Sequence, residues 1–371
     1  MRIVVVDESR PDATASAGER AVVDLMAALL DLGHDVGFYP EASRPGADIA
    51  RPPLPGVEVV GVPGTGAAGL APQLDPVDLV IVSRPGPGAR LLPMLQARPH
   101  LARALLGHDL HHVRLEAQQR LVGGVRPGEL AAVRLMERHC WLGYDVCAYP
   151  SEVEANVVAA QAGSSAVAVV PLYRVPQVQP GPPPPGCRLV LVGGSGHAPN
   201  LDAVRWAAAE VLPAILGRVP EADLVVVGDW PESLRPQHPR LRFTGRVPAP
   251  QLDDELAAAR VALAPLRFGA GVKGKVVDAL GRGLPVVGTS VALEGLVGVE
   301  SSGAAWRGDD PDRIAIAVAA LGDDDLWRAA AAAGPTWVQP RYGVRAHTAA
   351  VAAWLADTQS RARSRRAGVV E

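Results

Sequence analysis

The sequence predicts an α/β protein made of two Rossmann-like domains, each a parallel β-sheet covered by helices on both faces. Short apolar runs alternate with longer helical patterns through both halves of the 371-residue chain. Apolar strands that alternate with helices are typical of parallel sheets buried on both sides. A proline-rich stretch, VPQVQPGPPPPG at 175–186, divides the chain into halves of similar size and can form neither a helix nor a central strand.

The first half opens with a strand at 2–6 (RIVVV), followed by a helix over 19–33. Helical spacing places one set of apolar residues on a common face, and Gly33 ends the pattern. These residues are Val22, Leu25, Met26, Leu29 and Leu30. Further strands are predicted at 35–40, 57–62, 77–82, 103–107 and 145–150.

The second half repeats the alternation. Strands are predicted at 188–192, 222–228, 241–245, 261–266 and 284–288, and helices at 201–216, 250–260 and from about 275. A last helical pattern covers 342–357. In such sheets ligands bind at the carboxyl ends of the strands, so we expect a site facing a cleft between the two domains.

These patterns set the expected boundaries. We expect an N-terminal domain at 1–174, a linker at 175–186 and a C-terminal domain at 187–345. A helix at 346–358 is expected to pack back toward the N-terminal domain. The remaining tail, 359–371, is expected to be disordered, with its arginines either solvated or touching an anionic surface.

Composition excludes several classes of protein. A formal net charge of −3 gives no footprint for nucleic acid. The sparse cysteines Cys140, Cys147 and Cys187 form no CxxC pair, so we expect buried small side chains rather than disulfides or a zinc site. No apolar run is long enough to span a membrane or serve as a signal peptide, so the expected location is the cytoplasm, with at most peripheral membrane contact.

The stretch GAGVKGKVVDAL, residues 269–280, holds Lys273 and Lys275, the only lysines of the chain. The other cationic side chains are arginine, and this bias, with abundant Ala and Gly, is typical of a GC-rich genome. Lysine binds phosphate as a compact point charge, and the glycines around the pair leave room for a ligand. Asp278, three residues after Lys275 on the same helix face, could accept hydrogen bonds from a ribose diol. The stretch therefore predicts a nucleoside diphosphate site; the alternative is two solvated surface lysines.

A second glycine-rich turn, LVGGSGHAPNLDAV at 191–204, joins a strand to a helix that opens near Asn200. Backbone amides at such a turn can approach a phosphate, and a helix N-terminus favours anions. The third glycine of the dinucleotide fingerprint is missing, and no acidic residue follows at the required spacing, so NAD is not favoured. A purely structural turn is the alternative.

A third group, GHDLHHVRLEAQQR at 107–120, gathers polar residues after a predicted strand. It contains His108, Asp109, His111, His112 and Arg114. A metal site is one interpretation, but His108 and His112 have no glutamate between them as in the HExxH zinc motif. A polar lining for the cleft is favoured.

Together these motifs resemble glycosyltransferase family 4, the group 1 glycosyl transferases, which are retaining enzymes of the two-domain GT-B fold. The stretch at 191–204 resembles a family turn of the form VGGxxHxPN. FTGRV and APLRFGAGVKGKVVDALGRGLPVVGTSVALEGL resemble the donor-binding segment. In the first half, DLHHVR and YPSEVEANV resemble further family motifs. The likeness runs from RIVVVDESRPDATASAGER to the final helix.

The resemblance implies roles for individual residues. The first domain would take the acceptor and the second a nucleotide sugar, with Asp109, His111 and Lys275 as catalytic residues. The implied donor-binding residues are Gly194, Gly196, His197, Asn200, Arg246, Lys273, Lys275, Asp278, Glu294 and Gly295. Two positions depart from the family: Asp278 stands where a glutamate usually holds the ribose, and Ala270 where a glutamate usually contacts the sugar.

The expected function is transfer of a sugar from a nucleoside diphosphate sugar to a hydroxyl of a glycan, a lipid-linked or a natural-product acceptor. The resemblance implies retention of anomeric configuration with no cofactor and no metal, in bacterial polysaccharide or natural-product biosynthesis. Two alternatives stay open. One is a non-catalytic sugar-nucleotide-binding partner subunit, suggested by Ala270 and Asp278, and the other is a nucleotide-sugar epimerase, which would need carboxylate acid–base pairs.

Overall fold

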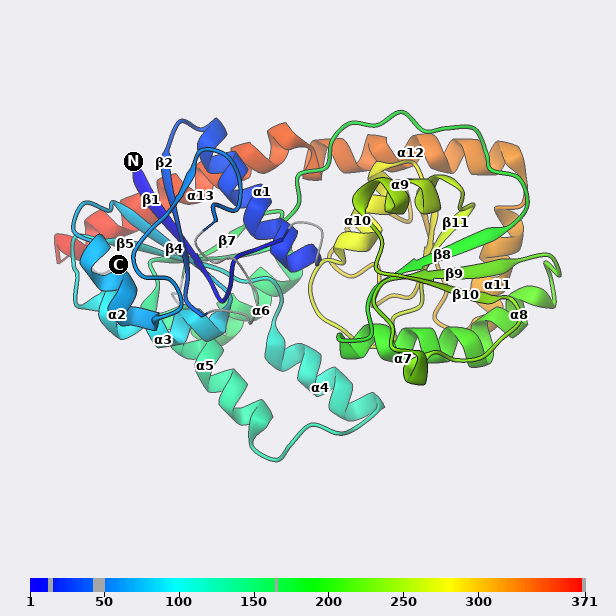
Figure 1. Ribbon diagram of the computed structural model, residues 1–371, viewed down its shortest axis with the longest axis horizontal. Coiled ribbons are helices and arrows are strands. Elements are labelled where there is room, and N and C mark those ends of the chain that lie inside the picture. The colour runs from blue at the N-terminus through cyan, green and yellow to red at the C-terminus, as the bar shows by residue number, and fades with distance from the viewer. Residues whose placement is uncertain (13–15, 43–50, 164–165, 369–371) are drawn as a thin grey trace. The chain divides into compact units, whose positions relative to one another are not determined.

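The computed structural model describes residues 1–12, 16–42, 51–163 and 166–368 (Figure 1). The chain divides into two compact units. Unit 1 comprises Met1–His112, Val125–Arg174 and Val344–Glu371, and unit 2 comprises Val113–Gly124 and Val175–Gly343. Each is considered by itself below. The last three residues of the predicted tail, 369–371, lie outside the described residues.

Unit 1 is built on a seven-stranded sheet in the order β3-β2-β1-β4-β5-β6-β7, and every pairing is parallel. The predicted strands are present, with the one at 57–62 shortened, and β7 was not predicted. Their bounds are β1 Arg2–Asp7, β2 Asp35–Pro40, β3 Val57–Val59, β4 Leu79–Ser83, β5 Ala102–Leu106, β6 Val146–Tyr149 and β7 Val167–Val169.

The helices of the first half connect these strands. Helix α1 begins after Ser16, whose hydroxyl accepts a hydrogen bond from the Glu19 amide, and its predicted apolar face is buried except for half-buried Leu30. The bounds are α1 Ala17–Asp31, α2 Gly66–Leu70, η1 Ala71–Gln73, α3 Pro85–Gln96, α4 His111–Leu121, α5 Glu129–Gly143 and α6 Glu152–Ala162.

Unit 2 contains a six-stranded parallel sheet in the order β10-β9-β8-β11-β12-β13. All five predicted strands are present, and β13 is additional. The bounds are β8 Arg188–Val192, β9 Asp223–Val227, β10 Leu241–Gly245, β11 Val261–Ala264, β12 Val286–Gly288 and β13 Ala305–Arg307. The prediction of two parallel Rossmann-like sheets is confirmed.

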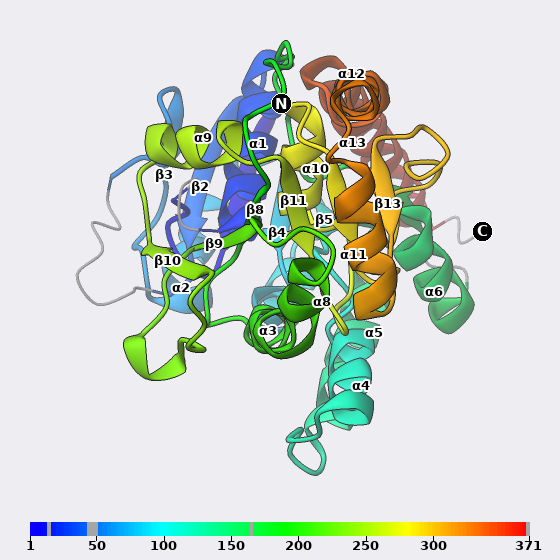
Figure 2. The same ribbon diagram turned by 90° about the vertical axis from the view of Figure 1, so that its right-hand side faces the viewer.

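Helices cover both faces of this second sheet. Figures 1 and 2 show α9 and α10 over one face and α8 over the other, with α11 packed beside α8. The helix predicted at 201–216 is interrupted by a π-helical turn, because Pro213 lacks an amide hydrogen and its ring crowds the preceding turn. The bounds are α7 Ala198–Trp206, η2 Ala207–Val211, α8 Leu212–Leu216, η3 Glu232–Leu234, α9 Ala249–Ala257, α10 Gly274–Gly281, α11 Pro311–Ala320 and α12 Asp324–Tyr342.

Alternation along β8 separates the two layers of the unit 2 core. Leu189 and Leu191 join the apolar cluster that includes residues of α8 and α11. Val190 and Val192 belong to the other face, where they line a small hollow together with residues of α10. Since successive strand residues point to opposite faces, one short strand supports both helix layers.

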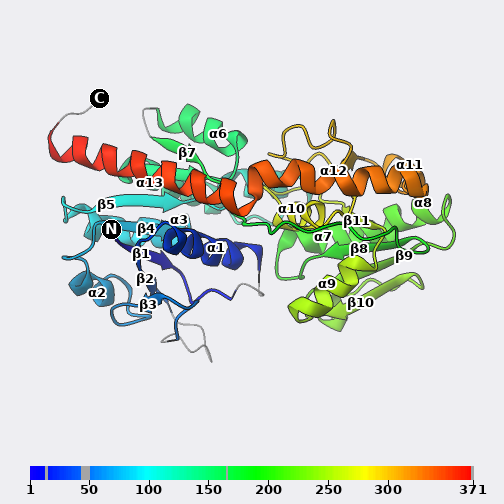
Figure 3. The same cartoon turned by 90° about the horizontal axis from the view of Figure 1, so that it is seen from above.

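The last helix, α13, spans Val344–Arg366 and packs on α1, β5 and β6 (Figure 3). The prediction of disorder from residue 359 is wrong as far as Arg366. The side chain of Arg365 donates to both carboxylate oxygens of Asp145, at 2.7 and 3.2 Å, and Arg366 donates to the His100 carbonyl at 2.7 Å. These bonds hold the end of the helix on unit 1, and the basic composition of the segment gave no sign of them.

The three cysteines are free and buried, as the sequence predicted. Burial raises the pKa of the Cys140 thiol to about 12 and that of Cys187 to about 11, because a thiolate would lose its hydration. Within the part of the chain that the structure describes, no helix combines the length and apolarity that a membrane crossing needs.

Arg260, at the start of β11, joins three segments of unit 2. Its guanidinium donates to the carbonyls of Leu321, Pro184 and Gly322 at 2.7, 3.0 and 2.9 Å, and to the Asp324 carboxylate at 2.6 Å. The side chain is only 6% exposed. Because buried carbonyls need donors, this one planar fork satisfies groups that would otherwise destabilise the fold.

We therefore expect Arg260→Lys to lower the free energy of unfolding by about 1.5–3 kcal/mol, since an ammonium cannot reach all four acceptors. Urea unfolding followed by tryptophan fluorescence measures this. The matched control is Arg328→Lys, whose ion pairs are exposed, with an expected change within about 0.5 kcal/mol. Equal stabilities of the two variants would contradict the structural role of Arg260.

Candidate functional site

The sheet of unit 2 has a point at which the chain reverses its direction of growth. From β8 the chain adds β9 and β10 on one side, and then returns to add β11 on the other side of β8. The connections that follow β8 and β11 therefore diverge, and ligands of open α/β sheets bind at such a switch point, outside the carboxyl ends of the strands.

The residues predicted to bind the donor come from connections at this carboxyl edge. They follow β8 (Gly194, Gly196, His197, Asn200), β10 (Arg246), β11 (Lys273, Lys275, Asp278) and β12 (Glu294, Gly295). Asn200 and Lys275 meet directly: the Lys275 ammonium donates to Oδ1 of Asn200 at 2.6 Å. This hydrogen bond joins the first turns of α7 and α10, and so bridges the switch point.

Asn200 also fixes the glycine-rich turn. Its Nδ2 donates to the Gly194 carbonyl at 3.1 Å, and Trp230 Nε1 donates to the Gly193 carbonyl at 2.7 Å. A Cβ at Gly193 would lie 2.7 Å from the Asn200 amide group, and the residue has a φ of 156°. Glycine is therefore required at 193 by close approach. The turn is held by side-chain contacts as well as by its backbone.

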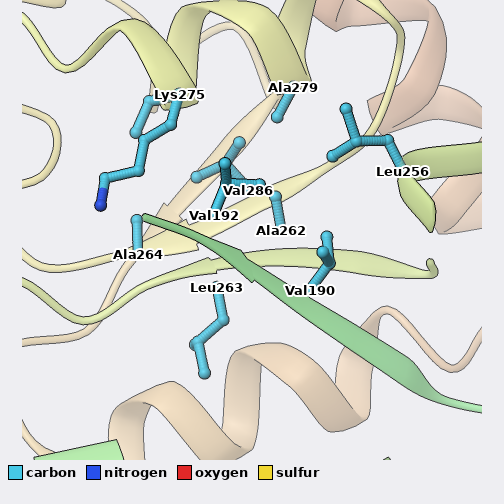
Figure 4. A pocket seen from close by; sticks show the side chains of 10 residues that line it. Val190, Val192, Leu256, Ala262, Leu263, Ala264, Lys275, Ala279 and Val286 are labelled. Carbon is cyan, nitrogen blue, oxygen red and sulfur yellow. The ribbon is translucent and has the colours of Figure 1, made fainter. Parts of the chain in front are cut away.

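The surroundings of Lys275 disfavour its charged form. In Figure 4 the side chain reaches toward Ala264 at the end of β11, beside a hollow lined by apolar residues of β8, β11 and α10. Desolvation, followed by repulsion from Lys273, lowers the pKa of Lys275 to about 8. The ammonium is charged below that pH, and its neutral amide partner leaves the charge uncompensated.

Lys273 has a different environment. It is the N-cap residue of α10 and is buried, and its ammonium donates to the Gly271 carbonyl at 2.5 Å and to Glu294 Oε2 at 2.9 Å. The charge of Lys273 is therefore paired within the protein, and that of Lys275 is not. Neither lysine is a solvated surface residue, so that alternative is wrong.

The other predicted donor residues surround this pair at greater exposure. Gly196, His197 and Arg246 are exposed, and a Cβ at Gly196 would meet no atom within 4 Å. Asp278 is half-buried in α10, one turn after Lys275, and Gly295 has a φ of 77° that suits glycine. Their roles toward a ligand stay predictions.

The polar group at 107–120 separates into two parts. His112 is 2% exposed, and its Nδ1 lies 2.6 Å from Glu137, which also accepts the amides of His111 and His112. Glu137 thus caps α4 from α5, and His112 serves the fold. His111 Nε2 lies 3.0 Å from Asp109, and both are partly exposed. Among the residues that the structure describes, no three His, Cys, Asp or Glu side chains are grouped to hold a metal ion.

The sequence analysis missed a group at the carboxyl edge of the unit 1 sheet. Arg84, directly after β4, pairs with Asp7 at the end of β1 through a 2.9 Å bond, and Ser83 contacts His108 at 2.8 Å. It also missed the partners Glu294 and Asn200 supply to the lysines. An acidic residue ending a buried strand was the available signal for Asp7; nothing in the spacing pointed to Arg84.

Comparison with known proteins supports this reading of unit 2. Residues 186–324 match the family model described as "Glycosyl transferases group 1", a segment that contains β8 to β13 and α11. The resemblance to this family is therefore confirmed for the segment that carries the lysine pair. No curated protein sequence matches the chain significantly.

Solved structures extend the likeness to both units. Sucrose-phosphate synthase from Thermosynechococcus elongatus has a TM-score of 0.74 at 15% identity, covering 97% of this chain and 100% of that one. HepE from Anabaena, in complex with UDP-glucose, has a TM-score of 0.70 at 16% identity, covering 96% and 99%. AviGT4, a glycosyltransferase involved in avilamycin A biosynthesis, has a TM-score of 0.59 at 19% identity, covering 99% and 98%. At these identities the likeness establishes the fold, which is GT-B.

The lysine pair makes a direct titration possible. With lysine labelled at the ε-carbon, the protein should give two NMR signals, and the one lost in Lys275→Met should titrate with a midpoint of about 8 instead of the ordinary 10.5. The cause is burial of the ammonium against a neutral partner.

A matched variant tests that cause. Asn200→Asp places a carboxylate at the same position, so the midpoint of Lys275 should rise. A midpoint near 10.5 in the unaltered protein would show that the ammonium is solvated and would contradict the geometry described above.

Proposed function

Because residues 186–324 match the group 1 glycosyl transferases and the chain has the GT-B fold, we propose that this protein transfers a sugar from a nucleoside diphosphate sugar to an acceptor hydroxyl. The observation that carries the proposal is the uncompensated charge of Lys275 at the switch point of unit 2. That position suits the diphosphate of a donor, since ligands bind at such edges and a lysine binds phosphate as a point charge.

The donor's other parts are assigned to neighbouring residues. We propose that Asp278 accepts hydrogen bonds from the ribose hydroxyls and that Arg246, His197 and Glu294 lie along the nucleotide sugar. The neighbour HepE has been solved with UDP and with UDP-glucose, which supports a uridine nucleotide as the first donor to test. Ala270 supplies no carboxylate to the sugar, so this chain's sugar preference does not follow from its family.

The proposed reaction breaks the bond between the anomeric carbon and the diphosphate oxygen. The acceptor oxygen bonds to the anomeric carbon on the same face, and its proton passes to the leaving diphosphate, so configuration is retained. Lys275 stabilises the negative charge that develops on the departing oxygen, in a site that is already organised. We propose that this needs no metal, because the protein itself supplies the cation.

The acceptor is assigned to unit 1, where Asp109 and His111 form a partly exposed pair 3.0 Å apart. A hydroxyl group can hydrogen-bond to either side chain. We propose that this pair orients the acceptor or the transferred sugar. The direct partners of His112 exclude that residue from such a role.

A non-catalytic sugar-nucleotide-binding subunit is the second candidate. Two observations favour it: position 270 is alanine, and the charge of Lys273 is paired with Glu294. Calorimetry with UDP, GDP and dTDP, beside a turnover assay over many acceptors, separates the two functions. Binding without turnover supports the subunit, and turnover excludes it.

We expect Lys275→Met to lower kcat/KM for the donor about tenfold or more, which corresponds to about 1.4 kcal/mol or more of lost transition-state stabilisation. Steady-state kinetics with the donor identified by calorimetry measures the effect. The reason is loss of the one lysine charge at this edge that the protein does not neutralise.

The control for this variant is Arg218→Gln, which removes an exposed cation shortly before β9, at the opposite edge of the sheet, and should leave kcat/KM unchanged. Thermal melting checks that Lys275→Met stays folded. Near-normal kinetics in a folded Lys275→Met protein would exclude Lys275 from catalysis.

The stereochemical proposal is checked by proton NMR of the first product formed, in which the anomeric coupling should match that of the donor. Turnover should also persist after treatment with EDTA, since Lys275 supplies the cation. An inverted product would refute the proposed same-face attack, and activity lost in EDTA and restored by a divalent metal would refute metal independence.

A further inference from the structure

Unit 1 has a switch point of its own. From β1 the chain adds β2 and β3 on one side and then β4 on the other, so the connections after β1 and β4 diverge at the carboxyl edge. Asp7 ends β1 and Arg84 follows β4, and Nε of Arg84 donates to Oδ1 of Asp7 at 2.9 Å. The ion pair bridges this switch point as the Lys275–Asn200 bond bridges that of unit 2.

Arg84 is held in a backbone conformation that a side chain disfavours. Its φ of 73° makes it the one non-glycine residue with positive φ in the described part of the chain. Its amide donates to the Leu106 carbonyl and its carbonyl accepts from Gly88, so both neighbouring elements fix the conformation. Such strain persists where it positions a side chain that the protein uses.

The guanidinium is only half employed. Asp7 is 2% exposed and takes Nε, whereas the two terminal nitrogens of Arg84 have no hydrogen-bond partner among the described residues. The side chain of Arg84 is 24% exposed. A guanidinium normally presents its terminal nitrogens as a planar fork to carboxylate or phosphate, and here that fork is available.

His108 provides a third unpaired nitrogen. Its Nε2 lies 2.8 Å from the Ser83 hydroxyl, and its Nδ1 is buried with no hydrogen-bond partner in the part of the chain that the structure describes. Desolvation and the neighbouring Arg84 lower the pKa of His108 well below its usual value, so the ring is neutral. With Nε2 accepting from Ser83, Nδ1 carries a hydrogen to donate.

Gly18 marks the place where these nitrogens converge. A Cβ there would lie 3.0 and 3.4 Å from the terminal nitrogens of Arg84 and 3.4 Å from Nδ1 of His108. Gly18 lies in the first turn of α1, an ordinary helical position where alanine would be the better helix former. The glycine thus leaves open the point toward which three unpaired nitrogens are directed.

We propose that Arg84, His108 and Gly18 form a second anion site, which binds a carboxylate or phosphate group of the acceptor. This rests on the function proposed above, because it assigns the acceptor's charge to unit 1. Asp7 is already occupied by Arg84 and by the Glu8 amide, and Glu19 accepts from the Asp12 amide, so neither carboxylate points its hydrogen-bonding capacity at the fork. The acceptor is then an acidic molecule rather than a neutral one.

The binding test uses small anions of the two kinds. In protein labelled with 15N-histidine, the Nδ1 signal that His108→Gln removes should shift when glucuronate or glucose 6-phosphate is added, and should not shift with neutral glucose. A response to glucuronate alone assigns a carboxylate and a response to glucose 6-phosphate alone assigns a phosphate. No response to either anion, or an equal response to glucose, overturns the proposal.

Two substitutions test the site by different routes. Arg84→Gly removes the fork and relieves the strained φ, and Gly18→Ala fills the convergence point while favouring the helix. Each should weaken anion binding about tenfold or more. Arg126→Gln, which removes a cation that is 85% exposed on the same unit, is the matched control and should leave binding unchanged. Unweakened binding in a folded Gly18→Ala protein also overturns the proposal.

A turnover arm separates this proposal from the one on which it rests. Paired acceptors that differ only in a terminal hexuronate or hexose should differ in KM, and Arg84→Gly should remove the difference while donor binding to unit 2 stays normal. If no acceptor reacts but the His108 signal still responds to anions, the transferase function fails and the anion site stands. If acceptors react with equal KM for charged and neutral forms, the anion site fails alone.

Discussion

The hydrogen bond between Lys275 and Asn200 is the constraint on which the unit 2 site depends. It can form only because β8 and β11 are neighbours whose connections part at the carboxyl edge, which brings the first turns of α7 and α10 together. Asn200 must also hold Gly194 and leave no room for a side chain at Gly193. Topology, turn sequence and helix start therefore converge on one ammonium group, and an amide partner orients that group without cancelling its charge.

The two units solve the same topological problem with different cations. At the switch point of unit 1 an arginine is anchored by one nitrogen to a buried carboxylate and keeps its fork, at the cost of a left-handed backbone. At that of unit 2 a lysine bonds to a neutral amide. In a chain otherwise rich in arginine, Lys275 is kept where a point charge fits, and Lys273 is kept where its ammonium must be buried between Gly271 and Glu294.

Much of this arrangement follows from the sequence, because period and glycine placement are local signals. The strands, the helix 19–33 and the lysine-bearing turn could all be predicted from them. Long-range partners could not: Arg365 pairs with Asp145 across 220 positions, so a basic, apparently solvated tail is part of a packed helix. The same limit hid the Asp7–Arg84 pair and made His112 look like a candidate ligand, because Glu137, which occupies it, lies on another helix.

The electrostatics of the lysine pair also connect the site to pH. Lys273 and Glu294 compensate one another, so the attraction for a diphosphate depends mainly on Lys275. Its pKa of about 8 means that the free site is charged below that pH and mostly neutral above it. A bound anion favours the ammonium and raises that pKa, so above pH 8 binding must take up a proton. The affinity for a nucleotide sugar, whose diphosphate keeps its charge over this range, is therefore constant below pH 8 and falls above it, and the fall disappears when position 275 cannot titrate.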